Sequence, residues 1–246
     1  MKLNCDMGES YGSWQMGDDK AVMPWVDMAN IACGFHASDP DIMSDTVACA
    51  VEHQVTVGAH PGYDDKPGFG RRSIPHSPAA ISHLVAYQTG ALDAVCQLHG
   101  TSVSYVKPHG ALYHDMMAKP DVLNAILAAI AAMNRLRPSP LSLMVLARAD
   151  NSETETAAQA FGVTLLFEAF ADRAYDEAGN LVSRSQPGAV HHDAARIKQQ
   201  AMELASGTVT THSGSVLALH ADTLCVHGDN PESIATIADI RKAIAL

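Results

Sequence analysis

Short apolar runs alternate along the chain with longer amphipathic segments. The runs are rich in Val, Ile, Leu and Ala, and most are continuous rather than alternating in polarity. Continuous runs are typical of strands that are covered on both faces, as in parallel sheets. The pattern therefore predicts buried strands at residues 2–6, 29–35, 55–60, 103–108, 141–147, 163–170 and 223–228.

The amphipathic segments predict helices at residues 38–53, 76–100, 120–134, 151–162, 192–207 and 229–246. Asp39, Ser77 and Asn230 each stand directly before a proline. A capping side chain satisfies free backbone N–H groups, and a proline loses no hydrogen bond in the first turn of a helix. In a further helix, Ser152 and Glu155 have the spacing of a capping box.

The alternation of strand and helix favours a parallel sheet with crossover helices, either an open doubly wound sheet or a closed barrel. A histidine follows each of four predicted strands, namely His36, His60, His109 and His227. An open sheet gathers its site at one switch point, whereas every strand end of a barrel faces the same mouth. We therefore predict one domain over residues 1–246, a distorted β/α barrel with seven strands. Residues 171–192 are predicted to be a long loop that covers the site.

Composition narrows the class of protein. The 246 residues have a formal net charge of −11, with 27 acidic and 16 basic side chains and no basic run. This balance is a poor match for nucleic acid or an anionic membrane surface. No signal peptide or membrane span is visible, so we expect a cytoplasmic protein. The five cysteines form no CxxC pair and are interpreted as reduced thiols. The alternative is that one of them, Cys33, is a catalytic thiol.

The strand ends collect the side chains that hydrolysis needs: a base for water, an acid for the leaving nitrogen and donors for an oxyanion. The candidates for catalysis are Asp6, Glu9, His36, His60, Lys107, His109 and His227. Other polar side chains at the same ends are Asn30, Tyr113, Glu168, Asp172, Arg173 and Asp229. Structural alternatives stay open, because Asp39 and Asp229 also suit helix starts and a lone histidine is more often hydrogen-bonded than catalytic.

Lys107 is the single residue that most strongly indicates a functional site. It lies between Val106 and Pro108 at the end of a predicted buried strand. An unpaired ammonium group is costly to bury, so Lys107 must hold an anion or pair with a carboxylate. The structural alternative is an ion pair with Asp6 or Glu168.

Cofactor motifs are weak in this sequence. Asp6, His60 and His109 are candidate ligands for zinc or a similar divalent ion, and His36 and His227 are of the right residue type. The HxH and HExxH spacings are absent, and no GxxxxGK[ST] phosphate loop occurs. The sequence therefore leaves metal binding open and predicts no P-loop nucleotide site.

Longer motifs carry a family resemblance. They are LNCDMGESYGSWQMGDD, ANIACGFHASDP, VGAHPGY, GFGRR, VKPHGALYHD, FEAFADRAY, LVSRSQPGAV and LCVHGDNP, in this order over nearly the whole chain. Together they resemble the LamB/YcsF family, whose members form the A subunit of the prokaryotic 5-oxoprolinase. The resemblance implies a distorted β/α barrel similar to that of polysaccharide deacetylases and glycoside hydrolases. One departure is Ser38, where the family usually has glycine.

The resemblance also implies an activity. It is the ATP-dependent opening of 5-oxoproline to L-glutamate, with ADP and phosphate formed, in a complex with subunits B and C. A lactam is a resonance-stabilised and poor electrophile, and phosphorylation of its carbonyl oxygen would expose the ring carbon to water. Because a P-loop is absent, our hypothesis assigns phosphorylation to the partners and hydrolysis to this chain.

In this scheme Asp6 or Glu9 activates water together with His60, directly or through a metal. Lys107 and His109 hold the phosphate or the oxyanion, and an arginine grips the substrate carboxylate. The candidates for substrate binding are Asn30, Arg71, Tyr113, Glu168, Asp172, Arg173, Arg184 and Asp229. Two rivals stay open: a metal-dependent deacetylase or carbohydrate-processing hydrolase of the same barrel type, and a non-catalytic scaffold subunit.

Overall fold

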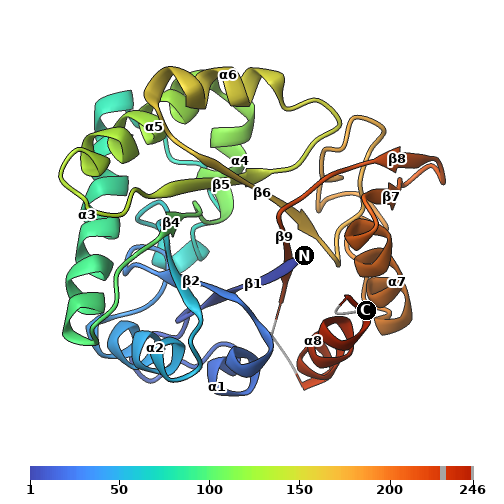
Figure 1. Cartoon of the computed structure of the whole chain (residues 1–246), viewed down its shortest axis with the longest axis horizontal. Coiled ribbons are helices and arrows are strands. Elements are labelled where there is room, and N and C mark those ends of the chain that lie inside the picture. Colours follow the sequence, from blue (N-terminus) through green and yellow to red (C-terminus); the bar gives the residue numbers. More distant parts are fainter. Residues whose placement is uncertain (228–230, 245–246) are drawn as a thin grey trace.

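Seven parallel strands close into a barrel at the centre of the molecule (Figure 1). The computed structural model describes residues 1–227 and 231–244, and of residues 231–233 the backbone only. The strands are β1 (Lys2–Met7), β2 (Met28–Ala32), β3 (Thr56–His60), β4 (Tyr105–Val106), β5 (Ser142–Leu146), β6 (Leu165–Phe170) and β9 (Thr223–Val226). Each strand pairs with the next in this order, and β9 returns to pair with β1. The predicted seven-stranded barrel is confirmed, and an open doubly wound sheet is excluded.

Helices surround the barrel (Figure 1). The predicted ones are α2 (Pro40–Glu52), α3 (Pro78–Leu98), α5 (Pro120–Asn134), α6 (Ser152–Phe161), α7 (Ala194–Ala205) and α8 (Pro231–Ile244). The sequence pattern did not indicate α1 (Asp19–Val22), the 3₁₀ turns η1 (Met23–Trp25) and η2 (Lys66–Gly68), α4 (Gly110–Ala118), or the hairpin of β7 (Thr208–Thr210) and β8 (Val216–Ala218). In the part of the chain that the structure describes, no single helix could span a membrane by length and apolarity. Helices α4 and α5 pass that test only as a pair, with a bend of 110°.

The helix starts follow the predicted capping signals with one exception. The Asp39 carboxylate accepts hydrogen bonds from two backbone N–H groups of the first turn of α2, and Ser77 caps α3 in the same way. The predicted capping box at Ser152 is wrong, because Ser152 is already the first helical residue. Asn151 takes the capping position instead, but its side chain bonds to the backbone of the preceding loop and not to the helix. The predicted cap at Asn230 lies outside the described residues.

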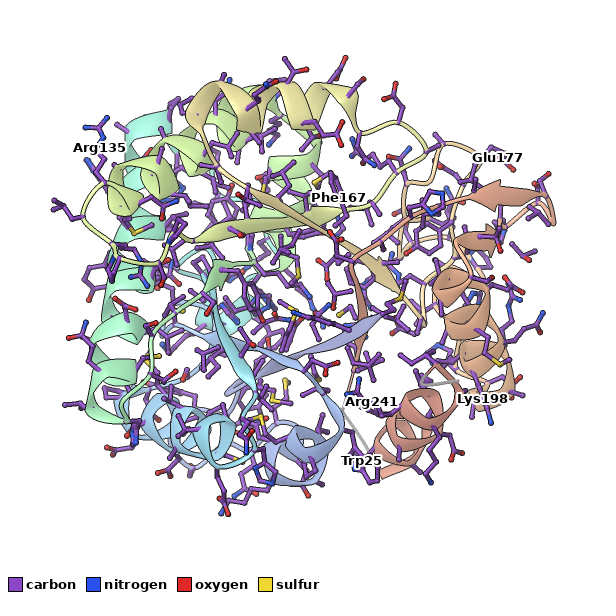
Figure 2. All side chains as sticks on the ribbon, viewed as in Figure 1. Trp25, Arg135, Phe167, Glu177, Lys198 and Arg241 are labelled. Carbon is purple, nitrogen blue, oxygen red and sulfur yellow. The ribbon has the colours of Figure 1, made fainter. Side chains whose placement is uncertain are left out.

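The barrel interior is packed with side chains and contains a layer of hydrogen-bonded polar groups. Side chains fill the middle of the ribbon ring, whereas charged residues such as Arg135, Glu177 and Lys198 lie at the periphery (Figure 2). Tyr105 reaches across the barrel because β3 carries Gly58, where an added Cβ would lie 2.1 Å from the tyrosine ring. The interior is therefore a packed platform beneath the carboxyl ends of the strands, not a pore.

The long segment between β6 and α7 is predicted as a loop, and it is folded on itself. The Arg173 guanidinium donates hydrogen bonds to the carbonyl oxygens of Val182 and Ala189. The Tyr175 hydroxyl accepts a hydrogen bond from the backbone N–H of Phe170. These contacts order the segment at the carboxyl end of the barrel, where it lines a cavity.

Candidate functional site

A cavity of about 1200 Å³ opens at the carboxyl ends of the strands. Among its lining residues are the predicted Asp6, Glu9, His60, Arg71, Lys107, His109, Tyr113, Asp172, Arg173, Arg184 and His227. Asn30, His36 and Glu168 lie just behind this lining, each fully buried and in contact with a lining residue. Asp229 lies outside the described residues. Barrel closure thus brings together candidates that come from strands far apart in the sequence.

Three histidines and one carboxylate form a compact cluster on one side of the cavity. The rings of His36 and His109 stack in parallel, with centroids 3.7 Å apart. The Glu9 Oε1 atom lies 3.4 Å from His36 Nε2 and 3.3 Å from His109 Nδ1. The His60 Nε2 atom lies 2.9 Å from His109 Nδ1. One donor atom from each residue falls within 4.8 Å of all the others, and these are donor types that a metal ion can use.

The charge state of the cluster follows from its burial. Burial lowers the pKa of His36 and of His109 well below the usual value of 6.5, and the neighbouring histidines add to the effect. Both imidazoles are therefore neutral at neutral pH, which is the form that ligates metals. Burial also raises the pKa of Glu9, and the charge of Asp6 adds to it.

Lys107 stands at the floor of the cavity between two carboxylates. Its Nζ atom lies 3.0 Å from Asp6 Oδ1 and 3.0 Å from Glu168 Oε2, so both partners expected from the sequence are present. Burial alone would lower the pKa of Lys107, but these neighbours hold it well above its ordinary value. Burial would raise the pKa of Asp6, yet the nearby His60 and Lys107 keep it well below its ordinary value. Asp6 is thus a half-buried anion, further fixed by a 2.7 Å hydrogen bond from Asn30.

A second acid–base pair, Asp172 and His227, also lines the cavity. Asp172 Oδ2 lies 2.8 Å from His227 Nδ1. Burial would raise the pKa of Asp172, but the charge of and hydrogen bond with His227 lower it. The Phe170 ring lies nearly parallel to His227, and its centroid is 5.4 Å from Lys107 Nζ. The Phe170 ring therefore contacts both this pair and the lysine.

The predicted substrate-binding arginines differ in what they contact. Arg173 is 3% exposed and directs its donors to loop carbonyls. Arg71 and Arg184 line the cavity with exposed side chains, and no described carboxylate pairs with either guanidinium. Tyr113 is buried, and burial together with the charge of Glu168 raises its pKa. The exposed arginines are therefore the ones free to meet an anionic ligand.

The comparison with known proteins starts from the whole chain. A family model described as LamB/YcsF family matches residues 1–246. The chain belongs to the LamB/YcsF family. Relatives named as the A subunit of 5-oxoprolinase are similar to it, from Vibrio vulnificus strain CMCP6 (57% identity over 99% of this chain and 96% of the relative) and from Pseudomonas fluorescens strain Pf-5 (56%, 98% and 96%).

Solved structures agree with the family assignment. The crystal structure of a lactam utilization protein from Thermus thermophilus superposes with a TM-score of 0.91 at 37% identity, covering 100% of this chain and 96% of that one. A putative cellobiose-phosphate cleavage protein from Enterococcus faecalis V583 has a TM-score of 0.54 at 11% identity, over 99% of this chain and 93% of that one. The latter likeness concerns the fold alone.

Two backbone features of this LamB/YcsF chain shape the cluster. Ser38 has a φ of +74°, a backbone conformation that favours glycine. Phe69 has a φ of +53°, and its carbonyl oxygen accepts a hydrogen bond from His109 Nε2. Sequence reasoning did not identify Phe69, because a backbone carbonyl leaves no residue-type signal beyond the two flanking glycines.

Four of the five cysteines are buried, and Cys49 is half-buried. All are free, and burial raises the pKa of the Cys33 thiol to about 12, which disfavours the alternative of a catalytic thiolate. The sulfur of Cys33 contacts the backbone carbonyl of Ile31. The sulfur of Cys225 lies 3.3 Å from Lys107 Nζ, a contact that sequence reasoning did not anticipate.

Proposed function

We propose that this chain is the A subunit of a 5-oxoprolinase and hydrolyses the lactam bond of 5-oxo-L-proline to give L-glutamate. The observation that carries the proposal is the meeting of Asp6, His60 and Lys107 at one cavity, in a chain 57% identical to a protein of that name. A half-buried anionic carboxylate next to an imidazole is suited to accept a proton from water.

The base is oriented by fixed contacts. The His60 Nδ1 atom lies 2.7 Å from the carbonyl oxygen of Lys107, so that nitrogen donates and Nε2 faces Asp6 at 3.4 Å. Asp6 Oδ1 is engaged by Lys107 and Asn30, which leaves Oδ2 as the oxygen that receives the proton of an attacking water. The contacts of Lys107 suit a role in keeping Asp6 ionised.

The leaving nitrogen needs a proton when the ring C–N bond breaks. The pair of Asp172 and His227 is suited to deliver it, with His227 as donor and Asp172 as the group that orients it. Arg71 and Arg184 are suited to grip the substrate carboxylate at the rim, since a guanidinium can bind a carboxylate in two places.

ATP enters this scheme through the complex. The chain has no P-loop, so we assign phosphorylation of the lactam oxygen to partner subunits B and C, with ADP and phosphate as co-products. A divalent metal held by the histidine cluster would supply a Lewis-acid charge for activation of water and of the carbonyl group.

The test is release of glutamate from 5-oxoproline and ATP, measured with this chain alone and with its partner subunits. We expect release only with all subunits, and a fall of at least about 100-fold for Asp6→Asn, a loss typical of a missing general base. His192→Ala, which changes an exposed histidine of the same cavity, is the matched control. Full activity of Asp6→Asn would contradict the catalytic assignment and favour a scaffold role.

The histidine cluster also favours a second candidate, a metal-dependent amide hydrolase that needs no ATP. Its test is hydrolysis of N-acetylated sugars by the metal-loaded chain in the absence of ATP and partner subunits. Activity under those conditions, without glutamate release by the full complex, would replace the first proposal with the second.

A further inference from the structure

Two histidines of the cluster have their tautomers fixed by backbone carbonyls. His60 Nδ1 lies 2.7 Å from the carbonyl oxygen of Lys107, and His109 Nε2 lies 2.9 Å from that of Phe69. A carbonyl oxygen can only accept, so both of these ring nitrogens carry the N–H group. In neutral rings, His60 Nε2 and His109 Nδ1 therefore carry lone pairs. Yet these two atoms lie only 2.9 Å apart. Because two lone pairs at this distance repel each other, a cation such as a proton or a metal ion must lie between them.

The remaining two members are polar atoms without ordinary hydrogen bonds. His36 is 1% exposed, and neither of its ring nitrogens has a hydrogen-bond partner among the described residues. The buried Glu9 Oε1 atom also has none, although it lies 3.4 Å from His36 Nε2. Buried polar atoms are nearly always paired, and leaving one unpaired costs about 1–3 kcal/mol. One donor atom of each of these residues lies within 4.8 Å of donor atoms of His60 and His109, and the parallel rings of His36 and His109 must tilt for both to face one ion.

The spacings match a coordination sphere better than a hydrogen-bond network. Ligand atoms about 2.05 Å from a metal are separated by about 2.9 Å on an octahedral edge and about 3.3 Å on a tetrahedral one. The His60 to His109 separation is 2.9 Å, and Glu9 Oε1 lies 3.3 Å from His109 Nδ1. The latter distance is long for a hydrogen bond.

We propose that Glu9 Oε1, His36 Nε2, His60 Nε2 and His109 Nδ1 bind one divalent transition-metal ion. Three imidazole nitrogens and one carboxylate oxygen suit zinc, or iron, cobalt or nickel, better than magnesium or calcium. The carbonyls of Lys107 and Phe69 are the outer contacts that hold two of the rings in the ligating tautomer. The site rests on the proposed function only for the use of the ion in lactam hydrolysis.

This ligand set differs from the one expected from the sequence. Asp6 is replaced, because its Oδ1 atom is held by Lys107 and Asn30 and its Oδ2 atom faces His60 from outside the cluster. A second group of metal-type donors, Asp6, Cys225 and His227, also exists. The Lys107 ammonium already lies 3.0 Å from Asp6 Oδ1 and 3.3 Å from Cys225 Sγ, so that group has its cation. The expected stoichiometry is therefore one metal ion per chain.

The test uses the full chain stripped of metal by a chelator and titrated with Zn²⁺ and with Co²⁺. We expect one equivalent bound, with cobalt absorption bands that report nitrogen and oxygen ligands. Glu9→Gln and His36→Gln should each weaken binding by at least about 100-fold, more than outer contacts usually contribute. His192→Ala, the control, and Asp6→Asn should both still bind one equivalent. Circular dichroism confirms that each variant is folded.

The outcomes separate the proposals. Less than about 0.1 equivalent of either ion bound by the folded chain would overturn the metal site and leave a shared proton between His60 and His109. Loss of binding in Asp6→Asn but not in His36→Gln would overturn the ligand set. One bound metal in a complex that releases no glutamate would refute the proposed activity alone. Full glutamate release by a metal-free complex would remove the ion from the reaction.

Discussion

Replacing Lys107 by methionine removes the ammonium group that two buried carboxylates share. Methionine nearly preserves the length of the side chain but donates no hydrogen bond. Glu168 is 0% exposed and Lys107 is 3% exposed, so water cannot readily take the place of the lost charge. Removing one partner of a buried ion pair costs about 3–5 kcal/mol. With a urea m-value of about 3 kcal/mol/M for a chain of this size, the unfolding midpoint should fall by about 1–1.7 M.

The loss should depend on pH in a defined direction. Burial already raises the pKa of Glu168, and removal of Lys107 raises it further. A carboxyl whose pKa is higher in the folded chain contributes its full stability below the unfolded value of about 4.3. That contribution is lost as the pH rises through the folded value. The destabilisation of Lys107→Met should therefore be largest at about pH 8 and shrink as the pH falls toward about 5.

The assay is urea unfolding followed by circular dichroism, in a double-mutant cycle of Lys107→Met and Glu168→Gln. The double variant should recover at least about 1.5 kcal/mol of the summed single losses, because no unpaired charge is left on Glu168. Lys119→Met is the control. Its side chain is 51% exposed, and Asp115 keeps hydrogen bonds from Tyr63 and Ser73 without it, so this loss should be about 0–1 kcal/mol. Additive losses, or equal losses at Lys107 and Lys119, would refute the reasoning.

Three further variants test other parts of the structure. Gly70→Ala should weaken both catalysis and metal binding, because the new Cβ would lie 2.8 Å from the His109 ring; unchanged zinc affinity would contradict this. Asp93→Asn should lower the free energy of unfolding by about 1–2 kcal/mol at pH 7. Burial would raise the pKa of Asp93, but the hydrogen bond and charge of Arg137 lower it below its ordinary value. The stability difference between the native chain and Asp93→Asn should therefore vanish as the pH falls through the pKa of folded Asp93. Urea titrations at several pH values measure it. Ser38→Gly should raise the free energy of unfolding by up to about 1 kcal/mol, and with it the thermal midpoint, since Ser38 has a φ of +74°. A lower midpoint would show that the contacts of the Ser38 side chain outweigh this backbone strain.

Local signals in the sequence determined the elements and their caps. Seven continuous apolar runs correspond to the seven barrel strands, and Asp39 and Ser77 begin their helices as expected. These features depend on the nearest few residues, which is why periodicity and capping chemistry suffice to predict them. Helix α4 (Gly110–Ala118) was not predicted, because it begins directly after the strand-end motif and has no capping side chain. The charge on Lys107 also followed from the sequence, since an ammonium at a buried position requires carboxylates nearby.

Tertiary structure alone decided how the candidate residues divide between groups. Each histidine follows a strand, but only barrel closure places His36, His60 and His109 beside Glu9 and pairs His227 with Asp172 instead. The tautomers of two rings depend on backbone carbonyls that carry no residue-type signal. Asn30, expected to meet the substrate, holds Asp6 in place because the pleat turns both side chains into the barrel. Such contacts join residues far apart in the sequence, and their distances exist only once β9 has paired with β1.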